Sequence, residues 1–255
     1  MPAVAVVLAL LLAGCTTTAT ASRPVATAPA TAIPATPSAT PPPAAGGPTT
    51  ALGVLATLPV KGKAPATGYQ RTEDFGTAWL DVDHNGCDTR NDILSRDLSD
   101  VARAGTCKVL SGTLADPYTG ATIHFVRGEK TSPLVQIDHV VALKNAWITG
   151  AQQLTEDQRI HLANDPLNLL AVDGPANQQK SDGDAATWLP ANKAFRCDYV
   201  ARQVSVKAAY GLWVAPAEHD AIARVLAGCP GQPASASALV IHTSRTGNGE
   251  ETRRP

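Results

Sequence analysis

The sequence predicts an α+β fold that combines a small β-sheet with several helices. Short apolar runs between turn residues indicate strands, as in Leu167 to Val172, which lies between Pro166 and Pro175. Segments with capping residues indicate helices, as where Thr155-Glu156-Asp157-Gln158 has the form of a capping box. The chain contains no internal repeat, so a repeat architecture is not expected.

The first half of the domain is predicted to contain a strand, a helix and two further strands. Residues Gly76 to Val82 alternate in the manner of a short strand. Asn91 is suited to cap a helix that ends near Ala104. Strands are then expected from Ala121 to Val126, after a turn, and over the apolar run Leu134 to Ile137.

The second half is predicted to be mostly helical, with one strand. The helix that begins after Thr155 is expected to end near Ala163, and the apolar run described above follows it as a strand. Pro175 is well placed for the first turn of the next helix. Further helices are expected over residues 140–148, 193–210 and 217–227, the last two closed by Gly211 and Gly228.

The N-terminus has the pattern of an export signal with a lipid anchor. Val4 to Ala13 is apolar but too short to span a bilayer as a helix. Leu12-Ala13-Gly14-Cys15 resembles a bacterial lipobox, in which the cysteine is lipidated. We therefore expect a signal peptide over residues 1–15, lipidation at Cys15, and an exported protein anchored to the extracellular face of the cell membrane. The alternative is a buried strand followed by an unrelated cysteine.

The composition divides the rest of the chain into two low-complexity ends and one globular domain. Thr16 to Thr50 contains 10 Ala, 10 Thr and 8 Pro, a composition with no apolar face to bury. We expect a disordered tether over residues 16–51, a domain over residues 52–229, and a disordered tail over residues 230–255.

The charge of the domain argues against a protein that stores or regulates DNA. From Lys61 to Cys229 there are 17 Lys and Arg residues against 20 Asp and Glu residues, a net charge of −3. Proteins that hold nucleic acid through counterion release are usually basic. The balance argues less against an enzyme that must release its product.

Four cysteines remain in the domain after Cys15. An even number in an exported chain suggests disulfide bonds. Three pairings are possible, and we favour the sequential pairs Cys87–Cys107 and Cys197–Cys229. A zinc site with four cysteine ligands is the weaker alternative, because the chain has no C-x-x-C pair.

Three polar points in the second half carry residues suited to the hydrolysis of a phosphodiester. Asp138-His139 lies at a strand end, Asn168 in the next strand and Asn177 at the start of the following helix, so a hairpin folded against that helix would bring them together. A histidine can act as a base near pH 7. Carboxylate and amide oxygens are ligands that Mg²⁺ accepts.

These residues resemble the HNH (ββα-metal) nuclease family. The resemblance rests on Asp138-His139, Asn168-Leu169 and Asn177-x-x-Lys180. The wider text, DHVVALKNAW through NDPLNLLAV to NQQKSD and TWLP, is similar to the C-terminal nuclease domain of GmrSD-type restriction enzymes. Upstream, FGTAWLDVD and GCDTRNDIL resemble exported actinobacterial members of that group. The resemblance covers nearly all of the domain and implies a ββα-metal core with additional helices.

The resemblance also implies roles for individual residues. His139 would be the general base, and Asn168 would orient it. Asp138 and Asn177 would hold one divalent cation, with Mg²⁺ expected first and Mn²⁺ possible because the ligands are oxygen atoms. Taken alone, Asn168 could instead form a turn at a strand end, and Asn177 could cap its helix.

Two cationic residues are candidates to contact the substrate. Arg90 could hold a phosphate, or it could pair with Asp88 or Asp92. Lys180 could contact a phosphate, or it could be a solvated helix lysine. The expected function is a metal-dependent endonuclease of low sequence specificity, with DNA favoured over RNA and no obligate protein partner. The alternatives are another metal-dependent phosphoesterase and a catalytically silent envelope lipoprotein.

Overall fold

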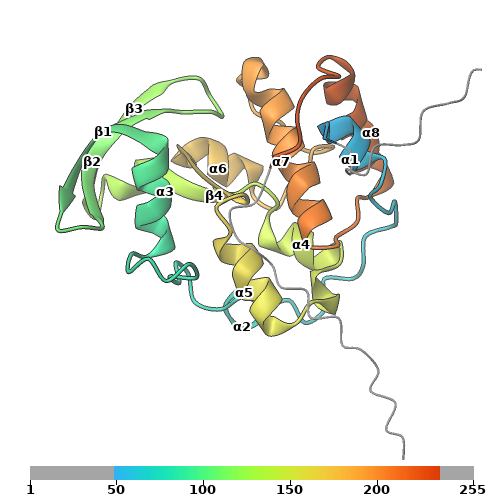
Figure 1. The fold of residues 1–255 in the computed structure, drawn as a ribbon, viewed down its shortest axis with the longest axis horizontal. Helices are drawn as coiled ribbons and strands as arrows, with labels where there is room; N and C mark the ends of the chain where they lie inside the picture. The colour runs from blue at the N-terminus through green and yellow to red at the C-terminus, as the bar shows by residue number, and fades with distance from the viewer. Residues whose placement is uncertain (1–48, 236–255) are drawn as a thin grey trace, which may run out of the picture. The chain divides into compact units, whose positions relative to one another are not determined.

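The computed structural model describes residues 49–235, which lie in one compact unit. The expected signal peptide, Cys15, and most of the expected tether and tail lie outside these residues. The described residues form an α+β fold of two small sheets and several helices (Figure 1). No helix among residues 49–235 is long and apolar enough to cross a membrane.

A three-stranded antiparallel sheet forms the first part of the fold. Its strands are β1 (Leu98–Ala104), β2 (Lys108–Ala115) and β3 (Thr122–Val126), in the spatial order β1-β2-β3. Helix α3 (Thr89–Asp97) precedes the sheet and contacts β1 and β2. Buried side chains of α3, β2, β3 and the second sheet form one apolar cluster, so this sheet is joined to the rest of the unit through its core.

The second sheet contains the polar pair that the sequence analysis identified. Strands β4 (Val135–His139) and β5 (Leu169–Asp173) are antiparallel, with His139 opposite Leu169. Helix α6 (Gly174–Lys180) begins directly after β5 and contacts both strands. A side chain at Gly174 would lie 2.2 Å from the carbonyl oxygen of Pro133, so glycine permits this close approach.

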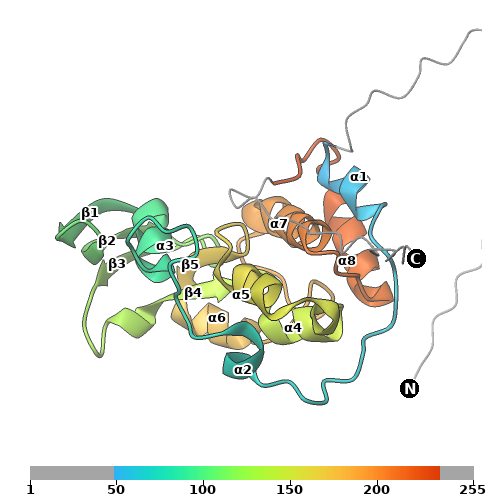
Figure 2. The ribbon, with the colours of Figure 1, turned by 60° about the horizontal axis from the view of Figure 1, so that its bottom comes forward.

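Two helices fill the long connection between β4 and β5. They are α4 (Leu143–Ile148) and α5 (Glu156–Asn164), separated by the 3₁₀ turn Ala151–Gln153. The predicted capping box is present, because Thr155 and Gln158 each bind the other's main-chain N–H. Helix α2 (Arg71–Phe75) contacts both α4 and α5, and the three helices lie together in Figure 2.

The remaining helices, α1 (Ala51–Leu55), α7 (Arg196–Ala209) and α8 (Pro216–Ala227), pack against one another. The 3₁₀ turn Lys193–Phe195 leads into α7, which contacts α8 and α1. Another 3₁₀ turn, Ser132–Leu134, precedes β4. The large apolar cluster of this part also takes side chains from β5, so the helical group and the second sheet share a core.

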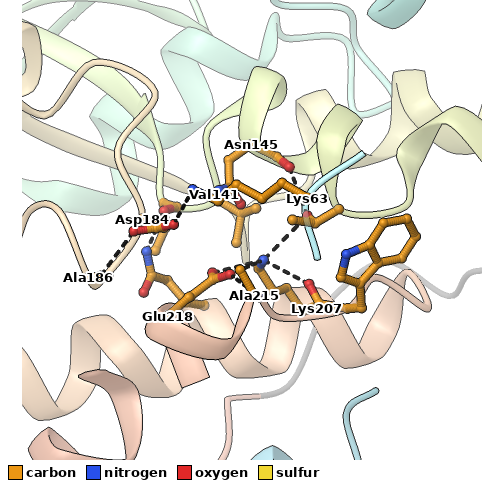
Figure 3. A network of polar contacts seen from close by, with 12 residues as sticks. Lys63, Val141, Asn145, Asp184, Ala186, Lys207, Ala215 and Glu218 are labelled. Atoms are coloured by element: carbon orange, nitrogen blue, oxygen red, sulfur yellow. Dashed lines mark hydrogen bonds and ion pairs between the residues drawn. The ribbon is translucent and has the colours of Figure 1, made fainter. Parts of the chain in front are cut away.

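A buried polar network joins α7, α8 and the end of α4 (Figure 3). The ammonium of Lys207 lies 2.8 Å from a carboxylate oxygen of Glu218 and donates to the main-chain carbonyl of Trp213 at 3.0 Å. It also donates to the hydroxyl of Thr149 at 3.3 Å. Glu218 accepts the main-chain N–H of Ala215, where α8 begins. The pair therefore fixes the N-terminus of α8 against α7.

Several predicted elements differ from those observed. The expected helix beyond residue 97 is instead β1, because residues 98–104 pair with β2. Asp88, rather than Asn91, accepts the N-terminal N–H of α3, while the Asn91 side chain accepts the N–H of Val109 on β2. Residues 76–82 form turns and bends rather than a strand. Strand β2 was not predicted.

Both predicted disulfide bonds are present. The pair Cys87–Cys107 has Cα atoms 5.3 Å apart and joins the loop before α3 to the β1–β2 connection. The pair Cys197–Cys229 has Cα atoms 6.5 Å apart and joins the start of α7 to the end of α8. The predicted pairing is confirmed.

The described residues form contacts beyond the expected domain limits at both ends. Thr50 caps α1 with its side chain and forms an antiparallel bridge with Pro233. The N–H of Ala51 donates to Gln232, and the N–H of Ala234 donates to Thr49. Residues assigned to the tether and the tail therefore pair with each other and close the helical group.

Candidate active site

Asp138 and His139, at the end of β4, line a pocket of about 440 Å³. Its lining comes from α2, β4, α4 and α6, and includes Arg71, Lys144, Asn177 and Asp182. The structure therefore brings together three of the four residues that the HNH resemblance singled out. Asn168, the fourth, is fully buried behind the pocket.

The imidazole of His139 is held so that one ring nitrogen faces away from its protein partner. Its Nε2 lies 2.8 Å from the carbonyl oxygen of Ala163, at the end of α5. The residue as a whole is 7% exposed. A carbonyl only accepts hydrogen bonds, so Nε2 carries the proton and Nδ1 of the neutral ring keeps its lone pair. The indole of Trp79 stacks on the ring, with centroids 6.4 Å apart and planes inclined by 15°.

The surroundings of His139 keep the ring neutral. Burial first, and then the positive charge of Arg71, lower the pKa of His139 to about 3. At neutral pH the imidazole is therefore uncharged, which is the protonation state in which a general base starts. A pKa this far below 7 also makes the ring a weaker base than a free imidazole.

Asn168 acts on the main chain around His139 rather than on the imidazole. Its Oδ1 accepts the N–H of Val141 at 2.8 Å, and its Nδ2 donates to the carbonyls of Val141 at 3.3 Å and Leu162 at 3.2 Å. These bonds connect the chain that leaves β4 to the end of α5. Ala163, which binds the imidazole, follows Leu162. Asn168 thus fixes the two segments that hold the ring.

Asp138 is paired inside the protein. Its carboxylate accepts the ammonium of Lys180 at 2.9 Å and the hydroxyl of Tyr118. The Lys180 ammonium also donates to the main-chain carbonyl of His139 at 2.8 Å. Burial raises the pKa of Asp138, and the nearby Lys180 ammonium acts in the opposite direction. The carboxylate therefore lines the pocket, and the buried Lys180 ammonium balances its negative charge.

The position of Lys180 corrects the expectation that it contacts a phosphate. The residue is only 2% exposed, and its ammonium points to Asp138 and the main chain of His139. A phosphate could reach the Lys180 ammonium only by displacing this buried ion pair. Lys180 is a counter-ion to Asp138, and it is not a solvated helix lysine either.

Asn177 lies within α6, with its side chain at the pocket. Its Nδ2 donates to Oε1 of Gln136 on β4 at 2.9 Å, which orients the amide. Within residues 49–235 its Oδ1 accepts no hydrogen bond from the protein. Asp173, not Asn177, caps α6 by accepting the N–H of Ala176. The capping alternative for Asn177 is therefore wrong.

The oxygen atoms of Asp138 and Asn177 suit a hard divalent cation. Each carboxylate oxygen of Asp138 has a lone pair beyond the one used by its protein donor, and the Asn177 amide oxygen is free within the described chain. Residues 49–235 contain no group of three His, Cys, Asp or Glu side chains that could hold a metal ion. A cation here would need water or substrate oxygens for its other positions, as Mg²⁺ commonly does.

Arg90 is not at the pocket. Its guanidinium donates to the main-chain carbonyl of Val135 at 3.2 Å, where β4 begins, and burial lowers its pKa. The residue supports the strand that carries the site, so the expected phosphate contact is not supported. The cations that line the pocket are Arg71 and Lys144, and the sequence analysis identified neither.

A second, smaller pocket of about 50 Å³ lies on another side of His139. It is lined by Arg71, Trp79 and Asn164, among other residues. Trp79 has a φ of 67°, an unusual conformation for a bulky side chain. The segment after α2 therefore turns the indole toward the imidazole, a contact that no sequence pattern indicated.

Comparison with known proteins assigns most of this region to one family. The model of the family described as "GmrSD restriction endonucleases, C-terminal domain" matches residues 88–225. A protein of Arthroderma benhamiae described as an uncharacterized secreted protein is 37% identical over 198 residues, which are 76% of this chain and 93% of that protein. No solved structure matches the chain.

Proposed function

Because the chain belongs to the family of GmrSD restriction endonuclease C-terminal domains, we propose that it is a metal-dependent endonuclease with His139 as general base. The observation that carries this proposal is the placement of the His139 imidazole, whose Nε2 binds the carbonyl of Ala163 and whose Nδ1 is not used in that contact. It borders the same pocket as Asp138 and Asn177. A base and oxygen ligands in one pocket are what the hydrolysis of a phosphodiester requires.

His139 would remove the proton from the attacking water. The Nδ1 lone pair would take this proton, while the Nε2–H keeps donating to the carbonyl of Ala163. This carbonyl would stabilise the imidazolium that forms. Trp79 covers one face of the ring and limits its movement. Asn168 holds the main chain on both sides of this arrangement, which makes it a positioning residue.

Asp138 and Asn177 would hold one divalent cation through their side-chain oxygens. The cation supplies neutralisation of the charge that develops on the phosphate and the leaving oxygen. Oxygen ligands favour Mg²⁺, with Mn²⁺ as the alternative. The Lys180 ammonium favours the ionised form of Asp138, which a cation needs.

The proposed substrate is nucleic acid, with DNA favoured over RNA and little sequence specificity. The family assignment supports a nucleic-acid substrate. The net charge of −3 over residues 61–229 supports transient binding rather than tight retention. We propose no obligate protein partner.

The proposed location is outside the cell, with Cys15 as the lipid anchor at the membrane. The relative from Arthroderma benhamiae is described as secreted, and the two disulfide bonds suit an oxidising compartment. The lipobox-like Leu12-Ala13-Gly14-Cys15 supports the anchor. Mass spectrometry of the N-terminal peptide from membranes would detect the lipid on Cys15, and a free or absent Cys15 would refute the anchor.

Plasmid cleavage tests the proposed function. The purified chain should convert supercoiled plasmid to nicked and linear forms with Mg²⁺ or Mn²⁺, and EDTA should stop the reaction. Hydrolysis of a small phosphodiester without plasmid cleavage would favour a different phosphoesterase. If the folded protein cuts neither substrate with any divalent cation, the endonuclease proposal is wrong.

A further inference from the structure

The charged side chains that line the main pocket leave one cation without an acidic partner. Lys144 forms an ion pair with Asp182, at 2.9 Å. Asp138 is balanced by Lys180, also at 2.9 Å. Within residues 49–235, no carboxylate lies within ion-pair distance of Arg71. The pocket therefore presents one unpaired guanidinium, and an anion is the ligand that this charge favours.

The backbone that carries Arg71 is firmly held, although its side chain is exposed. The ring of Tyr69 packs on Phe75 and on Trp147, with centroids 6.2 and 6.0 Å away. Arg159 of α5 donates to the main-chain carbonyl of Asp74 at 2.7 Å. Helix α2 is thus fixed to α4 and α5, so the main chain that carries Arg71 at the pocket is held in place.

The guanidinium of Arg71 also lies close to the proposed base. Arg71 and His139 both line the main pocket and the smaller second pocket. An anion that binds in the main pocket would therefore have Arg71, Asp138 and Asn177 among the residues around it.

We propose that Arg71 binds the non-bridging oxygens of the phosphodiester that is cleaved. The planar guanidinium can donate two parallel hydrogen bonds to a phosphate, which a lysine ammonium cannot do. This inference rests on the proposed function and replaces the earlier expectation for Arg90 and Lys180, whose cationic groups are turned to protein partners. Arg71 would thereby orient the phosphorus for attack by the water next to His139.

Three variants test the role of Arg71. Arg71→Ala removes the guanidinium. Arg71→Lys keeps the positive charge but loses the two parallel N–H donors of the guanidinium. Arg103→Ala is the matched control, because Arg103 is an exposed arginine on β1 that lines neither pocket. The assays are cleavage of a DNA duplex with Mn²⁺ at several salt concentrations, binding of the same duplex in EDTA, and Mn²⁺ binding by calorimetry.

Arg71→Ala should lower kcat/KM for cleavage about 10- to 100-fold, the effect of one charge-assisted hydrogen-bonding group. Arg71→Lys should retain part of the activity, and Arg103→Ala should match the parent. Mn²⁺ affinity should stay within about twofold of the parent, because Arg71 donates no ligand atom. The slope of log K against log salt concentration for DNA binding should become shallower by about one, which corresponds to the loss of one phosphate contact.

Two results would overturn the inference. One is an Arg71→Ala variant that cleaves within about twofold of a parent that is itself active. The other is a loss of cleavage accompanied by an equal loss of Mn²⁺ affinity, since Arg71 would then support the metal site rather than the phosphate. A parent that neither binds nor cuts DNA would refute the proposed function instead, so the two failures are distinguishable.

Discussion

The ammonium of Lys180 lies 2.9 Å from the carboxylate of Asp138, and the two side chains are 0% and 6% exposed. The same ammonium donates to the main-chain carbonyl of His139. One buried lysine therefore contacts both residues of the Asp-His pair from behind. This contact connects α6 to the end of β4 and places a positive charge next to the proposed metal ligand.

Replacing Lys180 should impair metal binding, even though Lys180 is not a ligand. Lys180→Met fills a similar volume but leaves Asp138 without its cation, so the pKa of Asp138 should rise further and the carboxyl should bind metal less well. Breaking a buried ion pair is also expected to lower the free energy of unfolding by about 3–5 kcal/mol. Mn²⁺ titration and urea unfolding measure the two effects. The exposed Lys193→Met is the control, and equal Mn²⁺ affinity in both variants would contradict this account.

The three residues of the HNH resemblance that line the main pocket should respond differently to metal concentration. His139→Ala should slow plasmid cleavage about 100- to 10,000-fold at saturating Mn²⁺ while leaving Mn²⁺ binding intact, because it removes only the base. Asp138→Ala and Asn177→Ala should lose metal affinity, so excess cation should restore part of their activity. His124→Ala, an exposed histidine on β3, is the matched control. If His139→Ala cuts within about threefold of the parent, His139 is not the base.

The sequence predicted elements with local signals better than elements that depend on distant residues. Local signals mark the β4 and β5 runs and the capping box of Thr155, and the structure contains all three. Both disulfide pairs, favoured as sequential neighbours among three possible pairings, are also present. The segment 98–104 carries Leu98 and Val101 at helical spacing, yet it pairs with β2. Its strand conformation depends on residues 108–115, which local periodicity cannot take into account.

The partners of the site residues were harder to predict, because several are main-chain groups. The carbonyl of Ala163 holds the imidazole, and any residue type could supply it. Arg71 and Trp79 reach His139 from a distant part of the chain, without a motif that relates them to it. Lys180 was identified by its spacing from Asn177, but only the packing of α6 shows that it faces inward.

Substitution of Asn168 should affect both stability and catalysis. Asn168→Ala leaves the N–H of Val141 and the carbonyls of Val141 and Leu162 without their partner, which should lower the free energy of unfolding by about 2–4 kcal/mol. Asn168→Asp keeps an acceptor for the N–H but directs a carboxylate oxygen at two carbonyls, so it should be at least as destabilising. Urea unfolding measures both variants. An Asn168→Asp variant as stable as the parent would contradict the observed orientation of the amide.

The cleavage rate separates this role from a merely structural one. In conditions where Asn168→Ala is fully folded, kcat should fall less than in His139→Ala, because the base remains but its supporting chain is looser. KM should change little, since Asn168 is fully buried and does not line the main pocket. Asn192→Ala is a useful comparison, because Asn192 also donates from its amide to a main-chain carbonyl but lies away from His139. A kcat loss equal to that of His139→Ala would show that Asn168 takes a more direct part.

Removing one charge of the buried Lys207–Glu218 pair should lower the free energy of unfolding more than removing both charges together. Burial lowers the pKa of Lys207, and the adjacent Glu218 acts against that shift. Lys207→Met leaves a buried carboxylate without its cation, which should lower the free energy of unfolding by about 3–5 kcal/mol. In the double variant Lys207→Met with Glu218→Gln, the charge is gone, and the amide oxygen can still accept the N–H of Ala215 at the start of α8. The double variant should therefore be more stable than Lys207→Met alone.

Urea unfolding at pH 7 gives the comparison, with exposed Lys130→Met as the control. If the double variant is less stable than the single one, the loss comes from packing and the remaining hydrogen bonds of Lys207 rather than from an unpaired charge.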